Sequence, residues 1–159
     1  MSNIYFKLNG VSGESKDAGH QNWIDVDFYS WGTTQPNSMA TGGGAGVGKA
    51  VFKDLIVQSS FDRATPSLQK FCAQGQHAAE AHLSFFKAGG TPMEFQNITL
   101  KNVFVTSVLI IGMQHGVAKV QYGFQGSLVE ANYWEQQNNG SRGGESMFGF
   151  DIKANKAIL

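Results

Sequence analysis

The chain contains a glycine-rich segment, Gly43-x-x-x-x-Gly48-Lys49, whose spacing is that of a phosphate-binding loop. In such a loop the backbone amides and the lysine contact phosphate, a helix follows, and a Ser or Thr directly after the lysine holds magnesium. Here Ala50 follows the lysine, and residues 51–57 are typical of a strand, so no helix N-terminus would face a phosphate. These departures favour a flexible loop, with a small nucleotide-binding or hydrolytic enzyme as the alternative.

The other reactive side chains do not form a recognisable catalytic or metal-binding pattern. None of the four histidines has the i, i+4 partner or the neighbouring cysteines of a zinc site, and no Gly-x-Ser-x-Gly motif is present. Cys72 falls beside Leu68 on the apolar face of a predicted helix, which indicates core packing. Asp25 and Asp27 share a strand face and could form a carboxylate pair, but a solvated or salt-bridged face is more common. We predict no catalytic residue, no metal and no cofactor.

The composition favours association with other protein subunits. The 12 basic and 12 acidic residues balance, so nothing favours binding to nucleic acid or to an anionic membrane. Charged residues make up 15% of the chain, against about a quarter in an average globular domain. The sequence shows neither a long apolar segment nor the start of a signal peptide. We therefore expect a protein made in the cytoplasm, without membrane insertion, whose export would use a route that reads the folded chain.

Periodicity predicts a single all-β domain over residues 1–159, a barrel or sandwich with one helix. The helix should begin at Thr65-Pro66, with threonine as the cap, and end at Gly75. A turn over residues 88–92 should connect two strands. Residues 103–111 carry apolar side chains on both faces of the predicted strand, which is typical of a strand covered on both sides. Residues 138–145 read as a loop. The strands are predicted over residues 4–8, 23–31, 50–61, 82–87, 94–100, 103–111, 120–128 and 147–153.

The predicted strand over residues 23–31 changes face along its length. Ile24, Val26 and Phe28 form one apolar face, but Tyr29 and Trp31 have the opposite parity. A one-residue change of register moves side chains to the other face, so we predict a bend or bulge near Phe28 and Tyr29. If both rings enter the core, Ser30 points away from it. Ser30 is then either a filler on an exposed strand or a contact position where bulk is unwelcome.

Together these motifs resemble the Hcp family, the tube proteins of the bacterial type VI secretion system. The resemblance extends from the N-terminus to about Leu128 and rests on the order and spacing of several short motifs. Tyr29 stands where members often have a second tryptophan, and the Gly112–Ala118 connection looks short. The motifs are Gly13-Glu-Ser-Lys-Asp17, Ile24-Asp-Val26, Ser30-Trp-Gly32, Gly42-Gly-Gly44 to Gly48-Lys49, Asp54-Leu55, Thr65-Pro66 and Lys87-Ala-Gly-Gly90.

The resemblance implies a compact barrel of two β-sheets with one flanking α-helix and an extended glycine-rich loop. It implies six-membered rings that stack into a tube, are secreted without a signal peptide, and carry effector proteins in the lumen. The implied partners are other copies of the chain, effectors, and the sheath and spike proteins of the apparatus. It places Ser30 at the lumen. The implied ring-stacking turn is Lys87, Ala88, Gly89 and Gly90. The implied subunit-contact loop is Thr41, Gly42, Gly43, Gly44, Ala45, Gly46, Val47, Gly48 and Lys49.

A third possibility is a monomeric carbohydrate-binding β-sandwich that uses Trp23 and Trp134 as aromatic platforms. Exposed tryptophans are too common in β proteins to favour this function over a tube subunit.

Overall fold

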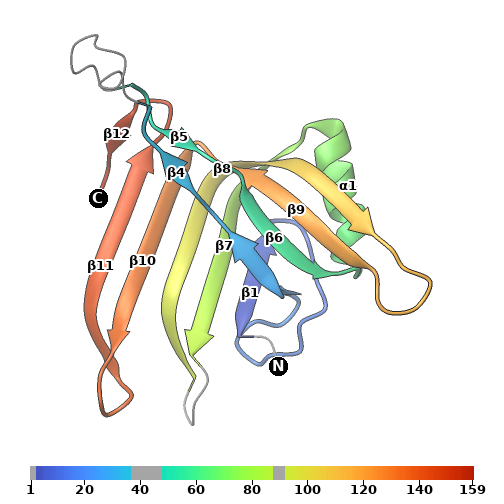
Figure 1. The fold of residues 1–159 in the computed structure, drawn as a ribbon, viewed down its shortest axis with the longest axis horizontal. Coiled ribbons are helices and arrows are strands. Elements are labelled where there is room, and N and C mark those ends of the chain that lie inside the picture. Colours follow the sequence, from blue (N-terminus) through green and yellow to red (C-terminus); the bar gives the residue numbers. More distant parts are fainter. Residues whose placement is uncertain (1–2, 37–47, 88–91) are drawn as a thin grey trace.

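The computed structural model describes residues 3–36, 48–87 and 92–159. Strands dominate these residues, together with one helix, α1 (Ala64–Gln74) (Figure 1). The strands are β1 (Ile4–Leu8), β2 (Ile24–Asp25), β3 (Phe28–Ser30), β4 (Thr33–Thr34), β5 (Val51–Phe52), β6 (Leu55–Ser60), β7 (His77–Lys87), β8 (Met93–Ile111), β9 (Lys119–Gln125), β10 (Leu128–Gln136), β11 (Arg142–Asp151) and β12 (Lys156–Ala157).

Two layers of strands are joined by β8, which takes part in both. The back layer has the order β12-β11-β10-β8-β7-β1-β2. The front layer consists of β3, β6, β9 and the far half of β8, in that order, and crosses in front of the back layer in Figure 1. Helix α1 lies behind the far half of β8. β4 and β5 form a separate two-stranded sheet that continues the line of β3 and β6.

The all-β class is confirmed, but the predicted barrel is not closed. The layers approach each other again between β2, which pairs with β1, and β3, which pairs with β6. At this corner the Val26 amide donates to the Ile4 carbonyl (3.0 Å) and the Asp27 amide to the Gln58 carbonyl (2.8 Å). Among the described residues no strand ladder joins β2 to β3. The chain crosses here from one layer to the other, and such a crossing interrupts regular pairing.

The same crossing explains the change of face in residues 24–31. Ile24 and Val26 are buried, Phe28 is 48% exposed, and Tyr29 and Trp31 pack against the core. The predicted change of face is therefore confirmed, although the interruption between β2 and β3 lies at residues 26–27, slightly before the predicted position.

The core lies between the layers and draws on both. Phe6 from the back layer packs against Phe124 from the front layer, with ring centroids 4.6 Å apart. Val57, Leu83 and Leu100 are also almost fully buried. Each side chain of this size stabilises the fold by about 1.5–3 kcal/mol when fully buried. The core therefore ties together strands that are distant in sequence.

Helix α1 begins at Ala64, one residue before the predicted start, so the prediction that Thr65 caps it was wrong. Arg63 occupies the cap position without a side-chain cap bond, and the carboxylate of Asp62, one residue earlier, accepts a hydrogen bond from the Ala64 amide (2.9 Å). Thr65 is buried, and its hydroxyl instead bonds to the Tyr122 hydroxyl of β9 (2.7 Å). Burial raises the pKa of the Asp62 carboxyl and of the Tyr122 phenol.

The other end of the helix agrees with the sequence. Gly75 has the left-handed conformation (φ 62°) that suits glycine after a helix, and its amide bonds to the Cys72 carbonyl (3.2 Å). The Cys72 side chain packs against the core, as predicted.

Several strand lengths also differ. The predicted strand over residues 50–61 is interrupted between β5 and β6, the one over 82–87 begins at His77, and the one over 120–128 ends at Gln125, before β10. The predicted strands over residues 94–100 and 103–111 are one 19-residue strand, β8. The predicted loop over residues 138–145 is shorter, because β11 already begins at Arg142. In the last two cases pairing with distant strands extends regular structure through residues that look like breaks in the sequence.

We expect Tyr122→Phe to lower the free energy of unfolding by about 1 kcal/mol, because it removes one partner of a buried hydroxyl pair. Urea unfolding would measure the loss. Tyr133→Phe is the matched control, because the Tyr133 side chain is 44% exposed and water replaces its hydroxyl contacts. An equal loss in both variants would mean that the Thr65–Tyr122 bond does not contribute.

Candidate interaction surface

Ser30 lies in β3 at the edge of the front layer and is exposed. Its neighbours Tyr29 and Trp31 pack against the core, so alternation turns the Ser30 side chain outward. The Tyr29 phenol donates a hydrogen bond to Gln96 Oε1 (2.9 Å), and burial raises its pKa, which keeps it a donor. This bond holds β3 against the back layer and fixes the direction in which Ser30 points.

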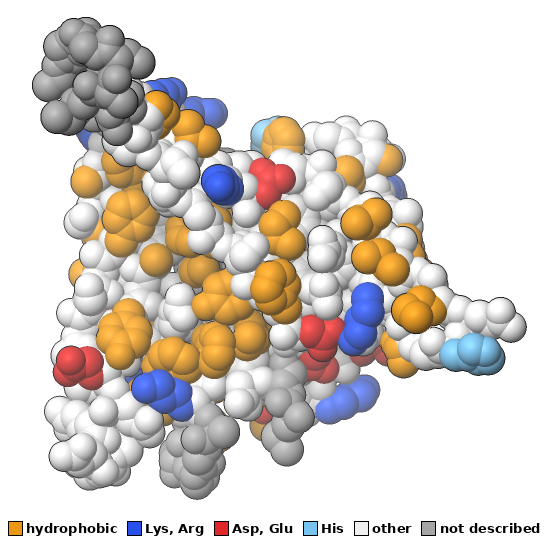
Figure 2. All heavy atoms as spheres, viewed as in Figure 1, with side chains coloured by type: hydrophobic (Ala, Val, Ile, Leu, Met, Phe, Trp, Pro, Cys, Tyr) orange, Lys and Arg blue, Asp and Glu red, His pale blue; other side chains and the backbone are white. Residues whose placement is uncertain are grey.

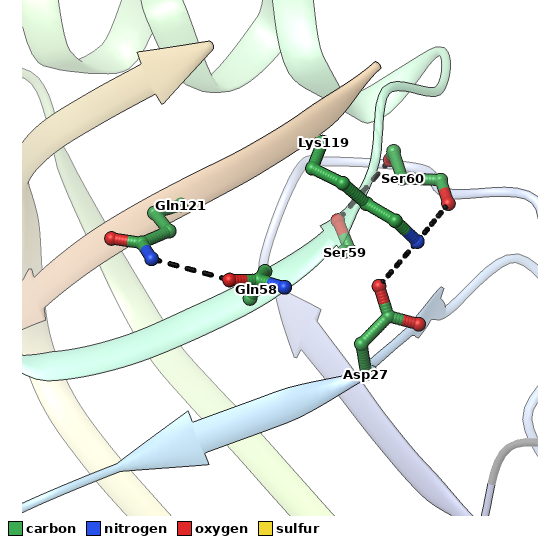
Figure 3. Close-up of polar contacts among 6 residues, drawn as sticks. All are labelled: Asp27, Gln58, Ser59, Ser60, Lys119 and Gln121. Atoms are coloured by element: carbon green, nitrogen blue, oxygen red, sulfur yellow. Dashed lines mark hydrogen bonds and ion pairs between the residues drawn. The ribbon is translucent and has the colours of Figure 1, made fainter. Parts of the chain in front are cut away.

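The outer face of the front layer, which we call the front face, has an uncharged centre. Strand register places Gln58 of β6 beside Gln121 of β9, and Ser30 beside Ile56. The Gln121 side-chain amide donates to Gln58 Oε1 (3.2 Å), as Figure 3 shows. Apolar side chains flank this centre, with Phe28 and Leu109 each about half exposed.

Charged groups stand at the margins of the front face and are engaged by neighbours. The Lys119 ammonium donates to the Asp27 carboxylate (2.7 Å) and to the Ser60 hydroxyl (3.1 Å) (Figure 3). At the other margin the Asp54 carboxylate accepts bonds from Thr106 (2.6 Å) and Gln125 (2.8 Å). Exposed ion pairs contribute little to stability, so the Lys119–Asp27 pair affects the charge of the front face more than the stability of the fold.

A shallow hollow of about 430 Å³ opens beside Ser30. Trp31, Gly32 and Ile56 form part of its wall, and Lys53 and Asp54 stand at its rim. Its hydroxyl, ammonium and carboxylate groups can accept or donate hydrogen bonds. Within the described ranges no cluster of three or more His, Cys, Asp or Glu side chains could hold a metal.

The predicted loop and turn are only partly within the described residues. Gly48 and Lys49 are exposed, and the chain after Lys49 continues into β5 rather than into a helix, as predicted. Lys87 ends β7, with its ammonium 4.9 Å from the centre of the Phe95 ring. Residues 41–47 and 88–90, which complete the predicted subunit-contact loop and ring-stacking turn, lie outside the described residues.

His20 and His82 make structural contacts with neighbouring side chains. His20 stacks on Tyr5 (centroids 4.4 Å apart) and bonds to the Asp17 carboxylate (2.8 Å). That hydrogen bond lowers the pKa of Asp17, whereas burial and nearby carboxylates raise the pKa of Tyr5. His82 bonds to Glu80 (2.9 Å). These contacts are ordinary hydrogen bonds and ring contacts.

Sequence reasoning missed how much apolar surface the chain leaves open. Residues 103–111 were predicted to be covered on both sides, but only the first half is buried. Leu109 is 53%, Ile110 38% and Ile111 46% exposed. The two-sided apolar pattern predicted cover that the described residues do not provide for residues 109–111.

The described helix is too short to cross a membrane. It has 11 residues, about half of what a spanning helix needs.

Comparison with known proteins gives consistent matches over the whole chain. A sequence profile of the family described as "Type VI secretion system effector, Hcp" matches residues 5–133. Protein hcp1 of Pseudomonas aeruginosa is 37% identical over 157 residues, covering 96% of each protein. A solved structure of a type six secretion system protein superposes with a TM-score of 0.91 at 29% identity, covering 99% of both chains. Hcp1 from Salmonella typhimurium superposes with a TM-score of 0.83 at 32% identity, covering 99% of this chain and 100% of that one.

We expect Gly123→Ala to lower the free energy of unfolding by about 1–3 kcal/mol through overpacking. A Cβ at Gly123 would lie 2.5 Å from Ser107 Oγ and 2.7 Å from Thr106 Oγ1, so the Thr106–Asp54 bond would have to move. Gly112→Ala is the control, because a Cβ there meets no atom within 4 Å. Thermal or urea unfolding measures both variants, and equal stability would show that the front face relaxes freely around residue 123.

Proposed function

This chain belongs to the Hcp family of type VI secretion proteins, and from that premise we propose that it is the repeating subunit of the secretion tube. The role we propose is that of a structural, secreted protein rather than an enzyme. In the proposed function six copies form a ring, rings stack, and effector proteins travel in the lumen. The exposed apolar edge of β8 is the single observation that best supports this assembly.

The distribution of apolar surface supports self-association through two different faces. Leu109, Ile110 and Ile111 are exposed at one edge of the front layer, whereas Tyr133 and Phe148 are exposed on the back layer. A symmetric dimer would pair one patch with itself. Two different patches favour head-to-tail contacts, which close into a ring when the rotation between subunits allows it. The low charged fraction of 15% suits a protein whose sides lie against other subunits.

The front face has the properties expected of a lumen wall that carries cargo. It is uncharged at its centre and its hollow beside Ser30 is shallow. Cargo must be held until firing and then released, so a small, polar contact suits the task better than a large apolar one. We assign Ser30 to this contact, the Thr41–Lys49 loop to subunit contacts, and the Lys87–Gly90 turn to ring stacking. In the proposed apparatus the tube also meets the sheath and spike proteins.

The alternative enzyme function has no observation in its favour. Lys49 is exposed and is followed by Ala50 and strand β5, so the requirements of a phosphate site are unmet.

The assembly can be tested directly with the purified protein. We expect native mass spectrometry to detect a species of six subunits, each of 17.2 kDa, and negative-stain images to show rings. A protein that stays monomeric at high micromolar concentration would contradict the proposed tube function.

The cargo contact is tested separately at Ser30. We expect Ser30→Phe to abolish co-purification of effectors expressed with the protein, because the phenylalanine side chain fills the hollow. The hexamer should persist. Ser30→Ala, which adds no bulk, should retain cargo. Loss of the hexamer in Ser30→Phe would instead show that Ser30 is part of the assembly contact.

A further inference from the structure

The turn between β10 and β11 contains an asparagine that is followed directly by a glycine, Asn139-Gly140. The turn projects from the ends of these two strands at the lower left of Figure 1, and Figure 2 shows it there as uncharged polar and backbone atoms in white. Residues 137–141 are all exposed. Asparagine is one of the chemically labile residues, and a glycine after it has no Cβ to keep a neighbouring atom away. A backbone nitrogen can therefore react with a side chain in this turn.

The Asn139 side chain is bent back over the glycine that follows it. Asn139 Oδ1 accepts a hydrogen bond from the Ser141 amide (3.0 Å). The ring of atoms that this bond closes contains both Asn139 Cγ and the Gly140 nitrogen, which are the two atoms that join when an asparagine deamidates. Gly140 has a φ of 85°, which glycine adopts without strain. The two reacting atoms are thus held within one short turn.

The Ser141 hydroxyl is a second donor to the same oxygen. It lies 2.7 Å from Asn139 Oδ1 and 3.0 Å from Gln137 Oε1, so its one hydrogen has the shorter path to Asn139. When a nitrogen attacks Asn139 Cγ, negative charge develops on Oδ1, and donors that already point at this oxygen stabilise the charge. The Ser141 amide and hydroxyl therefore have the arrangement of an oxyanion hole.

One contact opposes the reaction. The Gly140 amide donates to the Gln137 carbonyl (2.8 Å), and its nitrogen can attack only after it has left this carbonyl and lost its proton. Both groups lie in the exposed turn, so water can replace the amide at the carbonyl. Loss of the proton becomes easier as the pH rises, so the reaction should be faster in mildly alkaline solution.

We propose that Asn139 is a deamidation site and that the two Ser141 donors promote its reaction. The Gly140 nitrogen forms a bond to Asn139 Cγ, the bond from Cγ to Nδ2 breaks, and Nδ2 leaves as ammonia with the proton from Gly140. Water then opens the resulting succinimide at either carbonyl, which gives aspartate or isoaspartate. Water is the only other reactant. The reaction takes place within one chain and does not depend on the proposed assembly.

The products change the charge and the shape of the turn. The unmodified chain has a net charge of zero, and each converted chain gains one negative charge. Aspartate at position 139 keeps the two bonds from Ser141 and makes them charge-assisted. Isoaspartate adds one carbon to the backbone and breaks the turn. The end of β10 and β11 therefore acquires negative charge as the protein ages.

A second Asn-Gly pair in the chain provides an internal comparison. Asn9-Gly10 lies in an exposed turn after β1, and Gly10 has a φ of 86°. The Asn9 amide donates to the Glu80 carbonyl (3.0 Å), but no described residue donates to the Asn9 side chain. The two sites share the dipeptide, the exposure and the glycine conformation. They differ in the donors that contact the asparagine oxygen.

Ageing of the purified protein in mildly alkaline buffer tests the proposal, with peptide mapping by mass spectrometry to follow conversion at both asparagines. We expect Asn139 to convert about three- to tenfold faster than Asn9, which is the effect of one or two hydrogen bonds in the transition state. The same measurement in concentrated urea gives the ratio of the two rates in the unfolded chain. A ratio in the folded protein that exceeds the ratio in urea supports the proposal, and one that is no larger would overturn it.

Variants at Ser141 test the donors themselves. Ser141→Ala should slow conversion of Asn139 by about threefold, because it removes one hydrogen bond to the developing charge. Ser141→Thr keeps a hydroxyl and should retain the wild-type rate, and Asn139→Gln should abolish conversion at this turn. Conversion at Asn9 should be the same in every variant, which shows that the variants are folded alike. An unchanged or faster rate at Asn139 in Ser141→Ala would overturn the role of Ser141.

Discussion

The structure depends on one constraint, which is that a single strand, β8, takes part in both layers. Its first part pairs with β7 and β10, and its second part pairs with β9. A strand that changes layers must bend, and the register with β9 shifts between Val105 and Ser107 at that point. The extra residue, Thr106, bonds to Asp54 (2.6 Å). The bend places the two layers face to face, and the core lies between them.

The same bend determines where the fold is incomplete. Because β8 leaves the back layer midway, no other described strand pairs with one edge of its far half, and β3 is the last described strand at the other side of the front layer. The back layer continues further, through β10 and β11, than the front layer can cover. An isolated subunit therefore exposes apolar groups on both layers at a cost in free energy. Covering these groups by association recovers that free energy, which supports the assembly proposed above.

Alternation along β3, β6 and β9 then separates two tasks on one layer. Val57 and Tyr122 face inward and hold the core together, while Gln58 and Gln121 face outward and bond to each other. The inward set determines stability and the outward set determines surface chemistry. We therefore expect the core to tolerate changes on the front face, except at Gly123, where a Cβ would lie 2.5 Å from Ser107 Oγ.

The sequence alone determined the all-β class, the end of the helix at Gly75 and the outward direction of Ser30. These depend on local rules, namely periodicity, the conformational freedom of glycine and the alternation of a strand. It also disfavoured a phosphate site, because the residue after Lys49 has no hydroxyl. Only the tertiary structure showed that residues 93–111 form one strand, that Thr65 bonds to Tyr122, and that the barrel is not closed. Each depends on partners distant in sequence, and periodicity shows that a side chain needs cover without showing whether its own chain provides it.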